Sequence, residues 1–252
     1  MKKSIFKIIG ITSAFLFVLF VCGSIYAYYL LSTESGQDFP GNIASFRVTG
    51  SSRIDPQTIL ESLDRGDTDV FRMESGIPEN PQFIMPIEWT QAEFFEVAAA
   101  LHQTVWKEPL DDWNLYRMNF FTNCKDNPKG FSDVQLFFYK KVIVRERKMY
   151  SVREILVDSE YGYVAWGGDT YYPPPLFGGW KVINLKKMTI PADEALNIAE
   201  AKVGMDFRMS VENECRIFVD LNPEVYNRYA WQVDYRDNNN LYNHTELWIS
   251  PK

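Results

Sequence analysis

Residues 190–204 read IPADEALNIAEAKVG, and they decide the predicted fold because a helix is followed here by a set of strands. Pro191 suits the first turn of a helix, and Gly204 stands where the helix is expected to stop. The apolar residues recur at helical spacing and give the helix one buried face: Ala192, Ala195, Leu196, Ala199 and Val203. Strands are predicted after this helix over residues 216–221, 229–235 and 244–249.

The second of these strands has the clearest pattern. Over residues 229–235, YAWQVDY, large apolar side chains alternate with small or polar ones. Such alternation indicates a half-buried strand, with one face against a helix and the other in water. The sequence therefore predicts an α+β fold built from helix-plus-antiparallel-sheet units.

The same order of elements occurs earlier in the chain, which repeats weakly with a period of about 90 to 100 residues. A helix is predicted over residues 91–106, where Thr90 and Glu93 have the spacing of a capping box. Its strands are predicted over residues 115–121, 134–144 and 150–157. A segment rich in proline, glycine and aromatic residues, 169–188, is predicted to link the two copies.

These motifs carry a resemblance to a known family. The helix DEALNIAE, residues 193–200, followed by antiparallel strands, resembles the PepSY domain, and VDSEYG, residues 157–162, is similar to the acidic turn that closes such domains. The second copy departs from the pattern, because the chain ends in ISPK with no acidic residue or glycine. The resemblance implies two divergent PepSY-like units in an extracytoplasmic, non-enzymatic protein that binds or inhibits another protein.

A third region precedes the two copies. Residues 46–50 predict a short strand, and Asp55 and Pro56 begin a helix that runs to Leu63. This order is similar to the start of a POTRA domain, although the rest of that domain's pattern is not found.

The N-terminal segment predicts a membrane anchor. Residues 8–33 contain no charged side chain, and residues 8–31 would span about 36 Å as a helix, enough for a hydrocarbon core of about 30 Å. Positive residues precede the span: Lys2, Lys3 and Lys7. They predict a cytoplasmic N-terminus and an extracytoplasmic remainder. The alternative is a signal peptide cleaved near Ala27.

The predicted organisation has six parts, which are cytoplasmic residues 1–7, a transmembrane helix 8–31, a juxtamembrane segment 32–84, a first PepSY-like unit 85–168, a linker 169–188 and a second PepSY-like unit 189–252.

Composition limits the partners of the outer portion. Beyond Thr33 there are 23 basic and 33 acidic residues, a net charge of −10. Such a surface repels nucleic acid, so none is predicted as a partner. Two cysteines lie outside the span, Cys124 and Cys215, and in an oxidising compartment they could form a disulfide. Sequence alone leaves their pairing open.

The residue pattern predicts no catalytic, cofactor-binding or metal-binding group. His102 is interpreted as a flanking residue of the first helix, and His244 begins the last strand. Two isolated histidines and two isolated cysteines lack the spacing of a zinc site. No nucleophile elbow or phosphate-binding glycine loop occurs.

The predicted function is therefore binding. The sequence predicts a membrane-anchored extracytoplasmic binding or regulatory protein that acts through protein–protein contacts. A glycan- or peptide-binding module is the alternative, and a hydrolase is a more distant one. Aromatic residues in or beside loops form the candidate binding surface: Tyr171, Tyr172, Trp180, Trp113 and Trp166.

Overall fold

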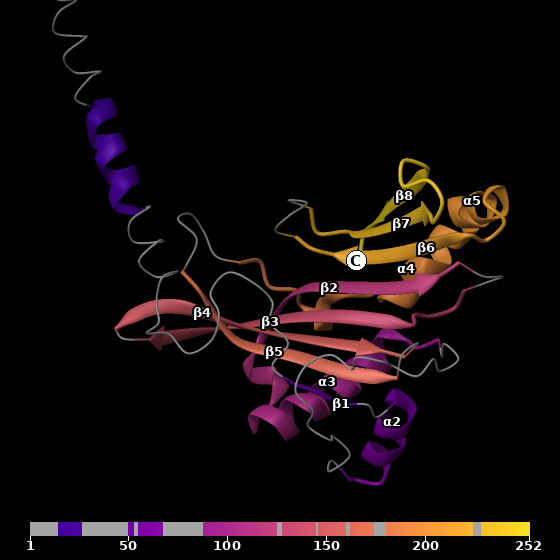
Figure 1. The fold of residues 1–252 in the computed structure, drawn as a ribbon, viewed down its shortest axis with the longest axis horizontal. Coiled ribbons are helices and arrows are strands. Elements are labelled where there is room, and N and C mark those ends of the chain that lie inside the picture. The colour runs from indigo at the N-terminus through magenta and orange to yellow at the C-terminus, as the bar shows by residue number, and fades with distance from the viewer. Residues whose placement is uncertain are drawn as a thin grey trace, which may run out of the picture.

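The computed structural model describes residues 15–26, 50–52, 55–67, 88–124, 128–144, 146–159, 162–173, 180–223 and 228–252 (Figure 1). They form an α+β fold around an antiparallel sheet with the strand order β1-β5-β4-β3-β2-β6-β7-β8. This confirms the predicted fold class at that level. The sheet is continuous, and both predicted units contribute strands to it.

The strands are β1 (Gly50–Ser52), β2 (Asn114–Asn123), β3 (Asp133–Val144), β4 (Arg147–Asp158), β5 (Tyr163–Tyr172), β6 (Cys215–Leu221), β7 (Trp231–Asp237) and β8 (His244–Ile249). The helices are α2 (Pro56–Asp64), α3 (Gln91–Trp106), α4 (Ala192–Ala199) and α5 (Met205–Ser210), with short helical turns η1 (Leu110–Asp112), η2 (Leu185–Lys187) and η3 (Glu200–Gly204).

Helix α3 covers the half of the sheet formed by β2 to β5. The predicted bounds and the capping box are confirmed, since the Thr90 hydroxyl accepts a hydrogen bond from the Glu93 amide while the Glu93 carboxylate accepts one from the Thr90 amide. The apolar stripe of α3 is buried against inward-facing side chains of the strands. Phe94, for example, lies 6.1 Å from Phe120 of β2 between ring centroids. The helix is thus held by the apolar face that its sequence period predicts.

Helix α4 covers β6 and β7, but the predicted stop at Gly204 is wrong. The helix continues through η3, a π-helical turn, into α5. Gly204 lies under the Tyr235 side chain of β7, and a Cβ at this position would collide with the Tyr235 ring and with the Glu200 carboxylate. The glycine therefore provides room for a core aromatic side chain instead of ending the helix.

The two halves meet at the β2–β6 pair and share one core. Phe120 of β2 lies 6.1 Å from Trp231 of β7. The N-termini of α3 and α4 also cap each other, because the Gln91 amide donates to Asp193 Oδ1 at 3.1 Å and the Ala192 amide donates to Gln91 Oε1 at 2.9 Å. Two segments about a hundred residues apart thus satisfy each other's helix ends.

A disulfide between Cys124 and Cys215 joins the end of β2 to the start of β6, with the two Cα atoms 5.1 Å apart. The Cys124 amide also donates to the Cys215 carbonyl at 2.8 Å. The pairing that sequence left open is therefore present, and it fastens the strand pair where the two halves meet.

Two sequence expectations are corrected in the sheet. The predicted linker begins too early, because residues 169–172 belong to β5, a strand that also contains the glycines at 167 and 168. A register shift between β4 and β5 near these glycines accommodates them. The strand predicted over residues 229–235 begins two residues later, at Trp231.

The N-terminal predictions are only partly covered by the structure. Residues 15–26 are helical, and the rest of the predicted span 8–31 lies outside the described residues. Within the described part of the chain, no helix has both the length and the apolar character needed to cross a membrane. Helix α2 confirms the helix predicted from Pro56, with Asp55 as its N-cap, whereas residues 46–49 of the predicted strand are outside the described ranges.

Candidate functional site

The candidate site lies on the face of the sheet that points away from the helices. Along β2 and β6, Phe120 and Val219 are fully buried in the core, so their neighbours Phe121 and Phe218 point to the opposite face. These two phenylalanines are direct cross-strand partners, and their rings pack edge to face at 5.3 Å. Both remain partly exposed. An aromatic pair thus lies on the outer face where the two halves of the sheet join.

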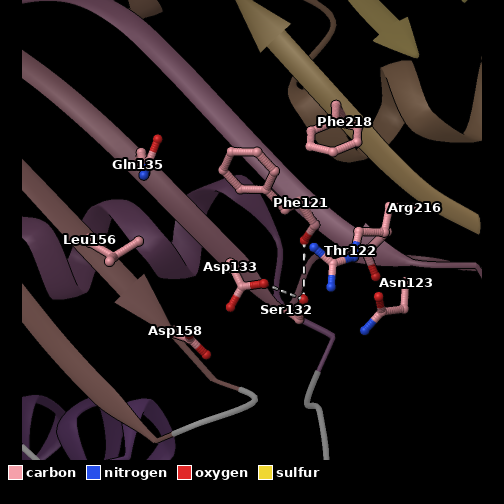
Figure 2. A pocket seen from close by; sticks show the side chains of 10 residues that line it. All are labelled: Phe121, Thr122, Asn123, Ser132, Asp133, Gln135, Leu156, Asp158, Arg216 and Phe218. Carbon is pink, nitrogen blue, oxygen red and sulfur yellow. Dashed lines mark hydrogen bonds between the residues drawn. The ribbon is translucent and has the colours of Figure 1, made fainter. Parts of the chain in front are cut away.

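A hollow of about 350 Å³ opens beside this pair (Figure 2). It is lined by side chains from the ends of β2, β3, β4 and β6: Phe121, Thr122, Asn123, Ser132, Asp133, Gln135, Leu156, Asp158, Arg216 and Phe218. The Ser132 hydroxyl donates to Asp133 Oδ2 at 2.8 Å, and the Ser132 backbone amide donates to the Phe121 carbonyl at 2.9 Å. These bonds tie the floor of the hollow to two neighbouring strands.

The hollow combines charges of both signs with apolar surface. Asp133 and Asp158 are direct cross-strand partners on β3 and β4, and Arg216 is exposed at the β6 side. The two carboxyl groups give this side of the hollow an acidic character. The guanidinium of Arg216 offers an anchor for a carboxylate. The hollow therefore suits a segment that carries both an apolar side chain and charged groups.

A second hollow of about 220 Å³ lies on the same face toward β5, and Tyr116, Arg117, Phe137, Glu154 and Tyr172 contribute to its lining. The Arg117 guanidinium lies 4.8 Å from the centre of the Phe137 ring, and its Nε donates to Asn119 Oδ1 at 3.0 Å. The Glu154 side chain is buried, and burial raises the pKa of its carboxyl to about 8 despite the opposing charge of Arg117. At neutral pH this carboxyl keeps its proton and can donate a hydrogen bond.

Trp180 and Tyr172, two residues of the predicted binding surface, do lie together. Trp180 stacks on Tyr116 at 4.7 Å and lies 5.6 Å from Tyr172, and its carbonyl accepts a hydrogen bond from the Tyr139 hydroxyl at 3.1 Å. Burial raises the pKa of the Tyr116 and Tyr172 hydroxyls. The cluster adjoins the second hollow, and it leaves Trp180 partly exposed.

The remaining three residues of that predicted surface do not join it. Trp166 is 2% exposed and belongs to the hydrophobic core, because β5 pairs with β4 and places this side chain on the helix-covered face of the sheet. Trp113 is 8% exposed. Tyr171 points to the opposite face from Tyr172 and packs with Met149. The prediction of a single aromatic surface is therefore wrong for Trp113 and Trp166, since both lie beneath other elements.

Trp113 and Trp106 instead enclose a buried cation. The Arg153 guanidinium lies 4.0 Å from the Trp113 ring centre and 4.6 Å from that of Trp106. The Trp113 indole donates to Glu108 Oε2 at 2.9 Å, and Arg153 reaches the same oxygen at 3.5 Å. Cation–π contacts and a carboxylate together compensate for removing the guanidinium from water.

His102 belongs to this buried cluster, which corrects its interpretation as a flanking residue. Its side chain is fully buried, with Nδ1 2.8 Å from the Glu108 carbonyl and Nε2 3.1 Å from the Arg153 guanidinium. A carbonyl only accepts, so Nδ1 carries the proton and Nε2 accepts from Arg153. Burial lowers the pKa of His102, and the imidazole is neutral. Its role is to bridge α3 to β4.

The second histidine lies elsewhere. His244 is exposed on β8, with Nδ1 3.4 Å from Asp234 Oδ1. Among the residues that the structure describes, no three histidine, cysteine, aspartate or glutamate side chains gather as a metal ion would require.

Comparisons with protein-family models, with curated proteins and with solved structures find no match to this chain.

Sequence reasoning missed the two phenylalanines of the open face. A signal was present, since FF at 120–121 and the IFV triplet at 217–219 place apolar residues on both faces of a strand. In a sheet with one wet face, an apolar side chain on that face marks a contact surface.

Proposed function

We propose that this protein is a membrane-anchored extracytoplasmic binding or regulatory protein that acts by contacting another protein through the open face of its sheet. Residues 8–31 would form a single transmembrane helix with the N-terminus in the cytoplasm. The outer portion would consist of two PepSY-like units, α3 with β2 to β5 and α4–α5 with β6 to β8, and would be non-catalytic.

Two features support the extracytoplasmic part of this proposal. The chain carries a disulfide, and such bonds persist mainly in oxidising compartments. Residues 8–33 lack charge and follow three lysines, the pattern expected for a span with a cytoplasmic N-terminus.

The order of elements supports the PepSY-like part. Each half of the sheet consists of a helix followed in the chain by antiparallel strands, and the N-termini of the two helices meet. This is the order on which the sequence resemblance rests.

One observation carries the binding part, namely the partly exposed Phe121–Phe218 pair beside a hollow of about 350 Å³ that has carboxylates and a guanidinium in its lining. Protein interfaces combine an apolar, aromatic centre with a polar rim in this way. The face spans the junction of the two units, so a bound partner would contact both.

Site-specific photocrosslinking tests the proposal. A benzophenone amino acid is placed at Phe218 in the full chain, or as a control at Glu194, which is exposed on α4 on the helix side. Illumination of native membranes should give a protein adduct from position 218, and excess unlabelled wild-type chain should compete it away. Equal adducts from both positions, or none from 218, would count against the open face as the contact surface.

A second candidate function is glycan or peptide binding, which the partly exposed Trp180 beside the second hollow favours. Aromatic faces beside a hollow suit sugar rings or extended peptides. This alternative predicts that oligosaccharides or short peptides change the tryptophan fluorescence of the wild-type chain and of a Trp248→Phe variant alike, but not of a Trp180→Phe variant.

A further inference from the structure

The β3–β4 hairpin extends beyond the rest of the sheet. Strand β2 pairs with β3 only as far as Tyr139, and β5 pairs with β4 only from Tyr150 onward. Beyond these points the two strands pair with each other, as far as Val144 and Arg147, and with no other described strand. These strand ends, residues 140–144 and 147–149, are called the overhang; they project to the left in Figure 1.

The overhang concentrates positive charge in a negatively charged protein. From residue 140 to residue 149 the sequence reads KKVIVRERKM, with five basic residues and one acidic residue, whereas the whole chain has a net charge of −7. Of these basic residues, Lys140 is paired with Glu108 and Asp112. Lys141 and Lys148 are exposed, and Lys148 is the direct cross-strand partner of Ile143. Because the rest of the surface is acidic, this segregation marks out a separate contact surface for an anion.

Apolar side chains accompany these charges at the end of the hairpin. Ile143 is 75% exposed, and Val142 and Val144 pack only partly over the buried Met149. Val142, Ile143, Lys141 and Lys148 contribute to the lining of a hollow of about 360 Å³. An isolated two-stranded ribbon is marginally stable in water, so a projecting one with an exposed isoleucine gains from being covered.

We propose that the overhang docks on the surface of a membrane that contains anionic phospholipids. Ile143 would enter the boundary between headgroups and acyl chains, while Lys141 and Lys148 bind lipid phosphates. Basic side chains flanking an exposed aliphatic residue are the combination that interfacial binding requires, with charge supplying attraction and the apolar side chain supplying depth. Docking would fix the orientation of the sheet relative to the bilayer, and it does not depend on the identity of the protein partner.

The chain provides its own control. The turn between β7 and β8 also exposes apolar side chains, Leu241 at 76% and Tyr242 at 95%, but asparagines surround them. If exposure of apolar surface alone were enough, this turn would bind membranes equally well. Because only the overhang carries lysines beside its exposed apolar residue, only the overhang should bind an anionic membrane.

The test uses the full chain with Cys22→Ser and one added cysteine, either Ile143→Cys or Leu241→Cys. The added cysteine is labelled with the environment-sensitive fluorophore NBD. Cys124 and Cys215 do not react with the label, because they form a disulfide. Each protein is reconstituted into phosphatidylcholine vesicles with or without about 30% phosphatidylglycerol. At position 143 we expect a blue-shifted emission with anionic lipid, reversed by about 0.5 M salt. At position 241 we expect no change.

Charge removal provides the second arm. Lys141→Gln with Lys148→Gln should abolish the shift at position 143, whereas Lys186→Gln with Lys187→Gln, two exposed lysines of η2, should not. Both variants should melt like the parent protein. A label at 143 whose emission responds equally to both lipid mixtures would overturn the proposal. So would an emission shift that is absent with vesicles alone and occurs only after a protein extract is added to them.

This outcome is separable from the proposed membrane span. If the chain fails to insert but still sediments with anionic vesicles through the overhang, the span is rejected and the docking is retained.

Discussion

At the scale of single residues, Glu154 connects burial to a measurable pH dependence. Its side chain is 7% exposed on β4, and burial raises the pKa of the carboxyl to about 8, with Arg117 acting in the opposite direction. The unfolded chain titrates near the ordinary value of 4.5. Between these two values the native state holds a proton that the unfolded state has lost, so the free energy of unfolding falls as pH rises through that window.

We therefore expect Glu154→Gln to remove this dependence. The variant should be more stable than wild type by about 1 to 3 kcal/mol near pH 9, and the two should converge below about pH 4.5. Urea denaturation at several pH values measures the difference, with the exposed Glu96→Gln as the control. Curves that stay parallel across the range would show that Glu154 ionises normally in the folded protein.

The two histidines give a matched pair at the same scale. His102 is fully buried between Arg153 and Glu108, whereas His244 is exposed. His102→Ala should lower the free energy of unfolding by about 2 to 4 kcal/mol, because it leaves a cavity and removes a hydrogen-bond acceptor from a buried guanidinium. His244→Ala should change it by less than about 0.5 kcal/mol. Similar losses from both changes would refute this placement of His102.

The lowered pKa of His102 also makes the free energy of unfolding depend on pH. The unfolded histidine takes up a proton near its ordinary pKa of 6.5, while the buried one resists protonation. The free energy of unfolding therefore declines as pH falls below that value, in the opposite sense to the effect of Glu154.

At the scale of elements, the disulfide fastens the β2–β6 pair where the two halves of the sheet join. It closes a separation of 91 residues, which in the chain-entropy model is worth about 4 to 5 kcal/mol. Cys124→Ser with Cys215→Ser should lower the denaturation midpoint and speed amide hydrogen exchange along β2 and β6 first. Cys22→Ser is the control and should have neither effect. An unchanged midpoint would mean that the pairing hydrogen bonds alone hold the junction.

Local patterns made some elements predictable. Helix α3 was predicted with correct bounds, because a capping box and an apolar stripe are encoded within a few residues of each other. Helix α2 was predicted from Asp55 and Pro56 for the same reason.

Other features could not be predicted from local sequence, because contacts with residues far along the chain determine them. Gly204 looked like a helix stop, but its glycine is required by Tyr235, about thirty residues later, whose side chain fills the space where a Cβ would lie. Strand β5 contains two glycines, which are unfavourable inside a strand, and only its pairing with β4 shows that it continues to Tyr172. The Phe121–Phe218 pair of the candidate site exists because β2 lies next to β6, and no local pattern specifies which strands become neighbours.

At the scale of the whole molecule, the sheet has two different faces. One carries α3 and α4 over a single shared core, and the other presents the aromatic pair, the hollow of about 350 Å³ and its charged rim. A sheet with a continuous core can hold such a face rigid, which lowers the entropy lost on binding. The central claim is that this face, and not the helices, contacts another protein.

Quantitative co-purification tests this claim most directly. The tagged full chain is crosslinked in native membranes through its lysines and recovered in detergent. The amount of partner that is recovered with it is measured by mass spectrometry. The same measurement is made on a double variant, Phe121→Ser plus Phe218→Ser, and on Glu96→Gln, a change at an exposed residue of α3. We expect the double variant to fold and reach the membrane but to lose at least ~tenfold of partner recovery, about 1.4 kcal/mol of binding free energy. The α3 variant should recover the partner like wild type. Undiminished recovery by a folded double variant would contradict the account.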